Sequence, residues 1–197
     1  MKAYHFLKDD MCGGYGNEPA WEVGEERDIG DDNLELCRRG YHSSPSWLAA
    51  LGYAMGTMAC IVKVSKPIAK DSTKYVSRRR KLINARNSEK VLRYWACDCA
   101  ERALKKTKVT DKRSWNAIKV ARLYNKGKAT KKELSTAWDA AGAAARAAVR
   151  ATAWDAARVA AGDAAVAAGN AARDAEEKYQ CRRLNWYMNK LFKEKIT

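Results

Sequence analysis

The chain has 197 residues, and 38 lysines and arginines against 23 acidic residues give it a formal net charge of +15. This length fits one large domain or two small ones. No stretch approaches the roughly 18 uninterrupted apolar residues of a membrane span, and the N-terminus has no charged region followed by an apolar segment. The sequence therefore argues against a membrane partner and against a signal peptide, and it predicts a cytoplasmic protein.

The first 85 residues show the pattern of short strands and turns. Alternating or β-branched runs predict strands over residues 2–7, 21–23, 58–64 and 74–83, with an acidic loop after the second. Between them, Ser44 and Pro45 predict a helix start, with Ser44 as the N-cap and Pro45 at the first helical position. The helix is then expected to run over residues 47–55 and to end at Gly56.

From residue 87 onward the apolar period changes from two to about 3.6 residues. Ser88 is expected to cap a helix whose buried face carries Val91, Leu92, Trp95, Ala96, Cys99, Ala100 and Leu104. A second helix is expected from about Asp111 to Gly127. The sequence Thr130 to Glu133 is a capping box that opens a long helical region. The last amphipathic stretch, with Leu184 and Met188 among its apolar residues, is expected to dock the C-terminus.

Residues 137–175 are dominated by alanine, and Ala-Trp-Asp-Ala-Ala at 137–141 recurs at 153–157. Alanine has the best helix propensity and the segment contains no proline, so a long helix is predicted rather than disorder. Small residues recur along one side of that helix, at Ala157, Ala161, Ala164, Ala168, Ala172 and Ala175. This alanine seam predicts a close helix contact, and it would let the chain form a homo-oligomer through these helices.

The six cysteines are scattered without a C-x-x-C pair, and only His5 and His42 could help them bind a metal ion. We therefore expect free structural thiols, no metal site and no cofactor.

Two parts of the sequence resemble known families. Lys2-Ala3-Tyr4, Trp21, Cys37, Gly40-Tyr41-His42-Ser43 and the run at 61–64 resemble an uncharacterised N-terminal domain of phage and prophage proteins. Residues 91–104 and 113–118, with the alanine-rich helix, are similar to a bacterial family named for immunity proteins, the Imm-5-like type. The resemblance implies an accessory protein of a phage or mobile element, acting in the host cytoplasm, or an immunity protein that binds a cognate toxin.

Basic residues gather in runs that could supply sequence-independent attraction to phosphates. The residues expected to bind a polyanion are Arg78, Arg79, Arg80, Lys81, Lys105, Lys106, Lys112 and Arg113. The partner would be nucleic acid or an acidic host protein. No RNA-binding aromatic motif or zinc finger is visible, so base-specific readout is not expected.

His42 offers a different hypothesis. Gly40-Tyr41-His42-Ser43, followed by a helix and a strand, resembles the segment with which ADP-ribosyltransferases hold nicotinamide. The resemblance implies a nucleotide-binding sponge or a related enzyme centred on His42, Trp21 and Arg39. No late glutamate motif of that family is recognisable, so no catalytic residue is predicted.

Together these observations predict an α+β protein. A small N-terminal β-sheet with one helix, over residues 1–86, is expected to pack on a C-terminal helical bundle over residues 87–197. The expected function is non-enzymatic. The protein is expected to bind nucleic acid or an acidic host protein through a basic face, and this binding would counter host defence. The alternatives are the nucleotide site at His42 and the immunity protein.

Overall fold

The computed structural model describes residues 1–14, 18–30, 33–106, 108–156 and 162–193, and for residues 144–173 the description is confined to the backbone. The chain has an α+β fold, as predicted. Its contacts divide it into two compact units. Unit 1 comprises Met1–Glu89 with Cys181–Thr197, and unit 2 comprises Lys90–Gln180. The apolar period of the sequence did not indicate that the end of the last helix packs in unit 1.

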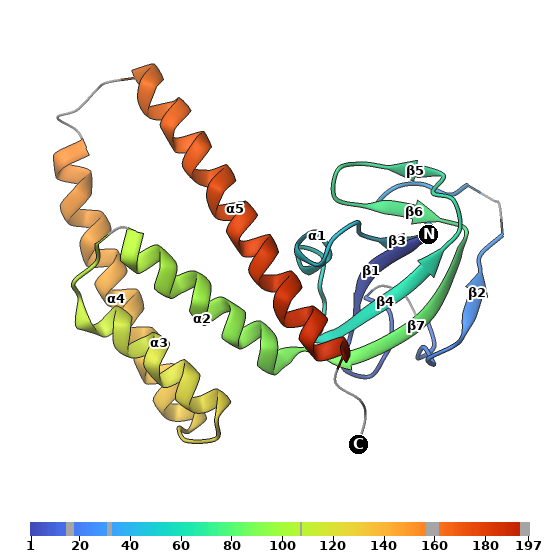
Figure 1. Cartoon of the computed structure of the whole chain (residues 1–197), viewed down its shortest axis with the longest axis horizontal. Coiled ribbons are helices and arrows are strands. Elements are labelled where there is room, and N and C mark those ends of the chain that lie inside the picture. Colours follow the sequence, from blue (N-terminus) through green and yellow to red (C-terminus); the bar gives the residue numbers. More distant parts are fainter. Residues whose placement is uncertain (15–17, 31–32, 107, 157–161, 194–197) are drawn as a thin grey trace. The chain divides into compact units, whose positions relative to one another are not determined.

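Unit 1 contains two antiparallel sheets (Figure 1). The first has the order β1-β4-β7-β2, with β1 at Lys2–Leu7, β4 at Met58–Val64, β7 at Arg79–Asn87 and β2 at Glu26–Asp28. The second has the order β3-β6-β5, with β3 at Tyr41–Ser43, β6 at Tyr75–Ser77 and β5 at Ala69–Lys70. The predicted strands at 2–7 and 58–64 are confirmed, whereas the run at 74–83 is two strands interrupted at Arg78, one in each sheet.

The predicted strand at residues 21–23 is wrong, and the acidic segment expected to be a loop forms β2 instead. The charges explain this difference. Glu26 pairs with Lys81 and Asp28 with Arg79 across the β2–β7 ladder, and opposite charges that face each other stabilise a strand pair. The acidic segment therefore has the composition of a loop when it is considered alone, and its pairing with the basic strand β7 makes it a strand.

The single helix of the N-terminal half, α1 at Trp47–Leu51, is shorter than predicted and begins with a different cap. The Ser46 hydroxyl accepts the Ala49 N–H at 3.2 Å. Ser44 cannot serve as the cap because its backbone is paired with Tyr4 through two hydrogen bonds, of 3.0 and 2.8 Å. The extended chain thus continues past Ser44 before the helix starts.

The core of unit 1 lies on the larger sheet and is built mostly from short side chains, with Trp21 as the largest. Trp47 of α1 is also buried and stacks on Phe192 with ring centroids 5.4 Å apart. Phe192 belongs to α5, Gly162–Lys193. Leu184 and Met188 are fully buried, which confirms the predicted apolar stripe near the C-terminus.

Gly56 allows the backbone to pass very close to β1. A Cβ atom at this position would lie 2.5 Å from Lys8 Cα and 2.7 Å from the Leu7 carbonyl oxygen. Because both are backbone atoms, we expect Gly56→Ala to reduce the free energy of unfolding of unit 1 by about 1–3 kcal/mol. Gly52→Ala is the control, since its Cβ would lie 3.4 Å from its nearest neighbour. Thermal unfolding followed by tryptophan fluorescence tests this, and equal midpoints for both variants would contradict it.

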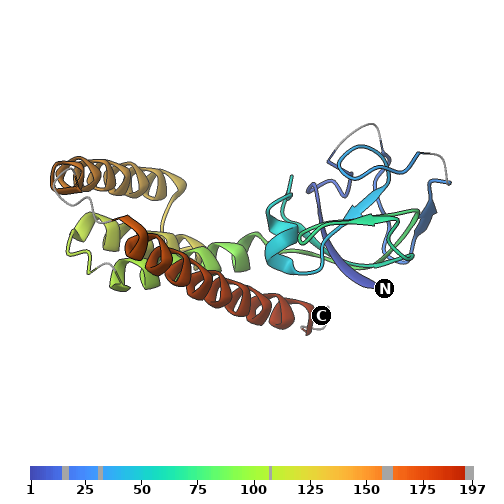
Figure 2. The ribbon, with the colours of Figure 1, turned by 90° about the horizontal axis from the view of Figure 1, so that it is seen from above.

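Unit 2 is helical. It contains α2 at Glu89–Lys106, which starts at the boundary, then α3 at Lys112–Asn125 and α4 at Lys131–Ala156, followed by the first part of α5. Helices α3 and α4 lie side by side (Figure 2). The predicted starts of α3 and α4 are confirmed: Asp111 accepts the Arg113 N–H at 2.9 Å, and Thr130 and Glu133 form the reciprocal capping box.

The buried face of α2 differs from the prediction. Ala96 and Ala100 are exposed, and Cys97 is buried against Ile118 and Ala121 of α3. Alanine fits either face of a helix, so the few large side chains of α3 and α4 decide which side is covered. Within the alanine-rich segment, Ala137 is buried and Trp138 is 65% exposed. Of the alanine seam, Ala175 is exposed, while the side chains of Ala157, Ala161, Ala164, Ala168 and Ala172 lie outside the described residues. The seam therefore stays a prediction.

Candidate functional site

Unit 1 contains a cavity of about 990 Å³. We call it the two-histidine cavity because both histidines of the chain line it. Its wall also carries Glu18, Arg38, Arg39, Lys74 and Arg80. Among the lining residues that the structure describes, four are cationic and one is a carboxylate, which favours an anionic ligand.

The two sheets meet at this cavity and bring its histidines together. His5 lies in β1 and His42 in β3, and the paired backbones of Tyr4 and Ser44 join these two strands. Gly40 makes the sharp entry into β3, with a φ of +124°. A Cβ there would lie 2.3 Å from Val76 Cγ2, so only glycine fits.

Arg80 is the most unusual residue of the site, because it is an arginine with only 4% of its surface exposed. One guanidinium nitrogen donates to the His42 carbonyl at 3.2 Å, and another lies 3.9 Å from the Glu18 carboxylate. The guanidinium also lies over the rings of Trp21 and Tyr41, at 4.4 and 4.9 Å. Burial lowers the pKa of Arg80 to about 10, so it still carries a full charge at neutral pH.

Both imidazoles are held in the neutral form. Burial lowers the pKa of His5 well below its ordinary value, with Arg80 and His42 acting in the same direction. Burial and the Lys74 ammonium lower the pKa of His42. The Nε2 atom of His42 accepts the backbone N–H of Cys37 at 2.9 Å. A neutral imidazole has one donor and one acceptor nitrogen, and in His42 the acceptor already receives the Cys37 N–H.

Glu18 is the carboxylate of the cavity wall, and it is engaged by arginines. Arg27 lies 3.4 Å from one of its oxygens and Arg80 lies 3.9 Å from the other. Its position requires Gly13, because a Cβ atom there would lie 2.2 Å from the Glu18 carboxylate. Glu18 thus serves first as the counter-charge of Arg27 and Arg80.

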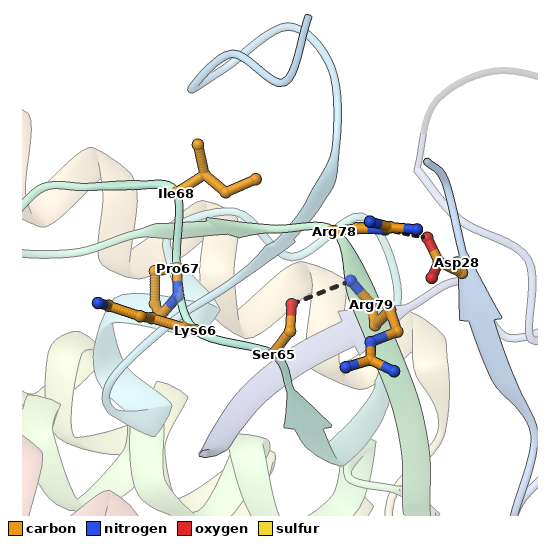
Figure 3. Close-up of a pocket in the computed structure, with 7 residues that line it drawn as sticks. All are labelled: Asp28, Ser65, Lys66, Pro67, Ile68, Arg78 and Arg79. Carbon is orange, nitrogen blue, oxygen red and sulfur yellow. Dashed lines mark hydrogen bonds and ion pairs between the residues drawn. The ribbon is translucent and has the colours of Figure 1, made fainter. Parts of the chain in front are cut away.

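The basic run at 78–81 does not form one exposed surface, because successive strand residues point to opposite faces. Arg79 is exposed, Lys81 is half-buried, and Arg80 faces the interior. Arg78 forms an ion pair of 2.8 Å with Asp28. Arg78 and Arg79 line a second hollow of about 570 Å³ with Ser65, Lys66, Pro67 and Ile68 (Figure 3). There the Arg79 guanidinium points away from Asp28, and the Arg79 N–H donates to Ser65 Oγ at 3.1 Å.

The predicted polyanion-binding residues of unit 2 are largely paired with carboxylates. Lys105 contacts Glu101 at 2.6 Å, Lys106 contacts Glu176 at 2.8 Å, and Arg113 contacts Asp111 at 2.6 Å. Lys112 is exposed. These ion pairs reduce the positive field that the sequence alone suggested, because each pair contributes almost no net charge at a distance.

The sequence-based hypothesis at His42 named residues that the structure places differently. His42 and Arg39 line the cavity, whereas Trp21 is buried in the core, where its ring contacts the Arg80 guanidinium. Sequence reasoning missed His5, Lys74 and Cys37 as lining residues. They come from three separate segments, and the sequence pattern carries no signal for their meeting.

Within the described part of the chain, no cluster of three or more histidine, cysteine or acidic side chains could hold a metal ion. The helices described there are also too short or too polar to cross a membrane.

Residues 1–94 match the family described as "Domain of unknown function (DUF7666)". This match covers β1 to β7 and the start of α2, and thus all the residues named above for the two-histidine cavity. No curated protein and no solved structure matches the chain.

Proposed function

We propose that unit 1 binds a small phosphorylated ligand of the nucleotide class in the two-histidine cavity. The observation that carries the proposal is the buried Arg80, whose closest carboxylate among the residues that the structure describes lies as far as 3.9 Å away. Burying a charge costs free energy unless close partners compensate it. A phosphate is the natural partner, since a guanidinium can donate two parallel hydrogen bonds to its oxygens.

The rest of the wall fits the two halves of such a ligand. Arg39 and Lys74 add positive charge for phosphates, while His42, Tyr41 and Tyr53 offer rings and polar edges for a base or a sugar. The cavity volume of about 990 Å³ is at the upper end of the range found for small-molecule sites, roughly 300–1,000 Å³. This proposal is for binding without turnover, because the Glu18 carboxylate already faces two arginines.

Calorimetric titration with NAD, ADP-ribose, ATP and short oligonucleotides tests the proposal. We expect heat with at least one mononucleotide, and a loss of affinity of about 10-fold or more in His42→Ala and Arg39→Ala. His42→Ala also removes the bond to Cys37 N–H, at about 1 kcal/mol of stability, so its melting curve is recorded beside the titration. Lys63→Ala, an exposed lysine that does not line the cavity, is the control. The absence of heat with every nucleotide would reject the proposal.

A second candidate function, polyanion binding, is favoured by a group of basic residues other than the eight expected above to bind a polyanion. Lys126, Lys128, Lys131 and Lys132, which we call the lysine turn, are all exposed around the α3–α4 connection. The structure gives them no ion pair with any carboxylate in the parts of the chain it describes. Nucleic acid or an acidic host protein would meet uncompensated charge here rather than at Lys105 and Lys106.

Neutralising the lysine turn with glutamine is expected to weaken DNA or RNA binding about 10-fold at low salt and to flatten its salt dependence, since each phosphate contact contributes roughly 0.9 to the slope. Lys105→Gln with Lys106→Gln is the matched control, expected to change binding far less because carboxylates already compensate both charges. Gel-shift titrations over a salt series measure both. The same loss in both variants would contradict this assignment.

A role in countering host defence, or as an immunity protein for a cognate toxin, rests on the family resemblance alone and is proposed on that ground. Homo-oligomer formation through the alanine seam is proposed likewise, and light scattering after size exclusion tests it.

A further inference from the structure

Cys37 stands apart from the other five cysteines of the chain. It is exposed, whereas Cys60 and Cys97 are buried and the remaining three are half-buried. Burial raises the pKa of Cys60 to about 12 and also raises the pKa of Cys97. Desolvation and Asp10 raise the pKa of Cys12. Thiols of this kind are poor nucleophiles at neutral pH, because the thiolate is the reactive form.

The thiol of Cys37 is hydrogen-bonded to an ammonium. Lys74 Nζ donates to Cys37 Sγ at 3.1 Å. Burial acts to lower the pKa of Lys74, but Cys37, Tyr53 and Asp71 raise it overall, so the side chain is a cation at neutral pH. The ammonium therefore places a positive charge directly beside the sulfur, where it attracts an anionic reagent.

Lys74 is held in place by its own surroundings. Its ammonium lies 3.9 Å from the centre of the Tyr53 ring, and Asp71 fixes the turn by accepting the Lys74 N–H at 2.7 Å. The backbone of Cys37 is anchored too, through its N–H bond to His42 Nε2 at 2.9 Å. The sulfur and the ammonium are therefore positioned from two separate segments rather than by one flexible loop.

An independent observation indicates that the space beside Cys37 accepts a ligand. Ser43 lines the same cavity and is 3% exposed. Its Oγ atom has no hydrogen-bond partner among the residues that the structure describes. A buried hydroxyl without a partner is costly, and a polar group entering the cavity would satisfy it.

We propose that Cys37 is a reactive thiol that, with Lys74 guiding the reagent, forms mixed disulfides with anionic low-molecular-weight disulfides entering the two-histidine cavity. The thiol first releases its proton to solvent. The thiolate then attacks one sulfur of the small disulfide, a new bond forms between Cys37 Sγ and that sulfur, and the original S–S bond breaks. Its electron pair leaves with the other half as a free thiolate. The reaction consumes only the small disulfide, and it does not depend on the proposed nucleotide site.

The charges of the cavity give the reaction its selectivity. Arg39 and Lys74 line the wall near Cys37, beside Arg38, which is paired with Glu35 at 3.5 Å. An anionic reagent is attracted there while an uncharged one is not. Dithionitrobenzoate, a dianionic disulfide, and dithiodipyridine, an uncharged one, are therefore a matched pair of probes.

The experiment measures thiol reaction kinetics of the folded full-length chain with both probes. We expect one thiol to react at least about 10-fold faster than the other five, and this fast phase to vanish in Cys37→Ser. Lys74→Gln is expected to slow the anionic probe at least about 10-fold and the uncharged probe less than about 3-fold. Lys74→Arg should restore most of the rate, and Lys70→Gln, an exposed lysine of β5, should leave it unchanged.

Melting curves of each variant confirm that the compared chains are folded. Incubation with glutathione disulfide, followed by peptide mass mapping, should place the added tripeptide on Cys37. A fast phase that persists in Cys37→Ser would overturn the assignment. If each probe reacts with Lys74→Gln as fast as it does with the unaltered chain, the role of Lys74 is overturned.

Discussion

Replacing Arg80 with methionine is expected to abolish most of the binding of a phosphorylated ligand while unit 1 stays folded. A hydrogen bond to a charged group contributes roughly 1.5–3 kcal/mol, so the loss of the guanidinium corresponds to about a 10- to 150-fold rise in Kd. Methionine keeps the length and the apolar character of the stem, and it fills irregular space well.

The stability of the unliganded chain responds differently. Removing a buried charge that lies 3.9 Å from the Glu18 carboxylate relieves a desolvation cost, and such replacements are often neutral or stabilising. Against this stands the lost bond to the His42 carbonyl and the lost contact with the Trp21 ring. These effects oppose each other, so we expect a small change in the unfolding midpoint beside a large change in affinity.

Arg79→Met is the matched control for this prediction. Arg79 precedes Arg80 in the same strand but is exposed on the other face. It should lose little affinity for a nucleotide. Calorimetry and thermal unfolding of both variants measure the two effects separately. If Arg80→Met instead lowers the free energy of unfolding by about 3–5 kcal/mol, as breaking a true buried ion pair does, Arg80 is a structural residue.

Local signals in the sequence identified most of the elements. The alternation in Lys2–Leu7, the β-branched run of β4 and the Thr130 capping box need no partner to be recognised, and all three are confirmed. Their physical cause lies within a few neighbouring residues, so a sequence pattern suffices. The same holds for the positive φ of Gly127, +69°, after α3.

Elements whose partners lie far away in the chain were predicted poorly. Strand β2 forms because its acids face the basic β7, more than 50 residues later. Ser44 fails as a helix cap because Tyr4 holds its backbone. On α2, the alanines and Cys97 suit either a buried or an exposed face, and the contact of Cys97 with Ile118 determines which face is buried. Each error arises where a long-range contact outweighs a local preference.

The candidate site follows the same rule. His42 and Arg39 were named through the resemblance of the segment Gly40-Tyr41-His42-Ser43 to a nicotinamide-holding segment, which is a local signal in the sequence. His5, Lys74 and Arg80 join them only through the pairing of β1 and β7 with β4, the pairing of β3 with β6, and the bridge between Tyr4 and Ser44. A run of four basic residues suggests one surface, yet the pleat of β7 sends Arg80 inward and Arg79 outward. Only the strand assignment separates a surface charge from a buried one.

Acidification from pH 7 to pH 5 is expected to destabilise unit 1 through its two histidines. Both have a folded-state pKa below the unfolded value of about 6.5. Above pH 6.5 the imidazoles are neutral in both states and contribute no pH dependence. Below it the unfolded chain takes up protons that the folded chain refuses, so stability falls until the pH reaches the folded-state pKa values. The loss amounts to about 1.4 kcal/mol for each unit of difference.

The chain is well suited to this measurement because His5 and His42 are its only histidines. Two imidazole signals are therefore expected in a proton–carbon correlation spectrum, both titrating below pH 6.5. The cationic groups that face them, Arg80 and Lys74, keep their charge throughout this range. The salt-bridged and hydrogen-bonded carboxylates, Asp28 and Asp71 among them, have pKa values lowered by their partners and protonate only in stronger acid. They do not contribute between pH 7 and 5.

His42→Gln separates the contributions of the two rings. The glutamine side-chain oxygen can accept the Cys37 N–H as Nε2 does, but it cannot take up a proton in this range. The variant should unfold at a midpoint that falls less between pH 7 and 5 than that of the unaltered chain, and the remaining fall should follow the titration of His5. An imidazole signal that titrates above pH 6.5 would contradict the burial of that ring beside Arg80, because a ring accessible to solvent or paired with a carboxylate would hold its proton to higher pH.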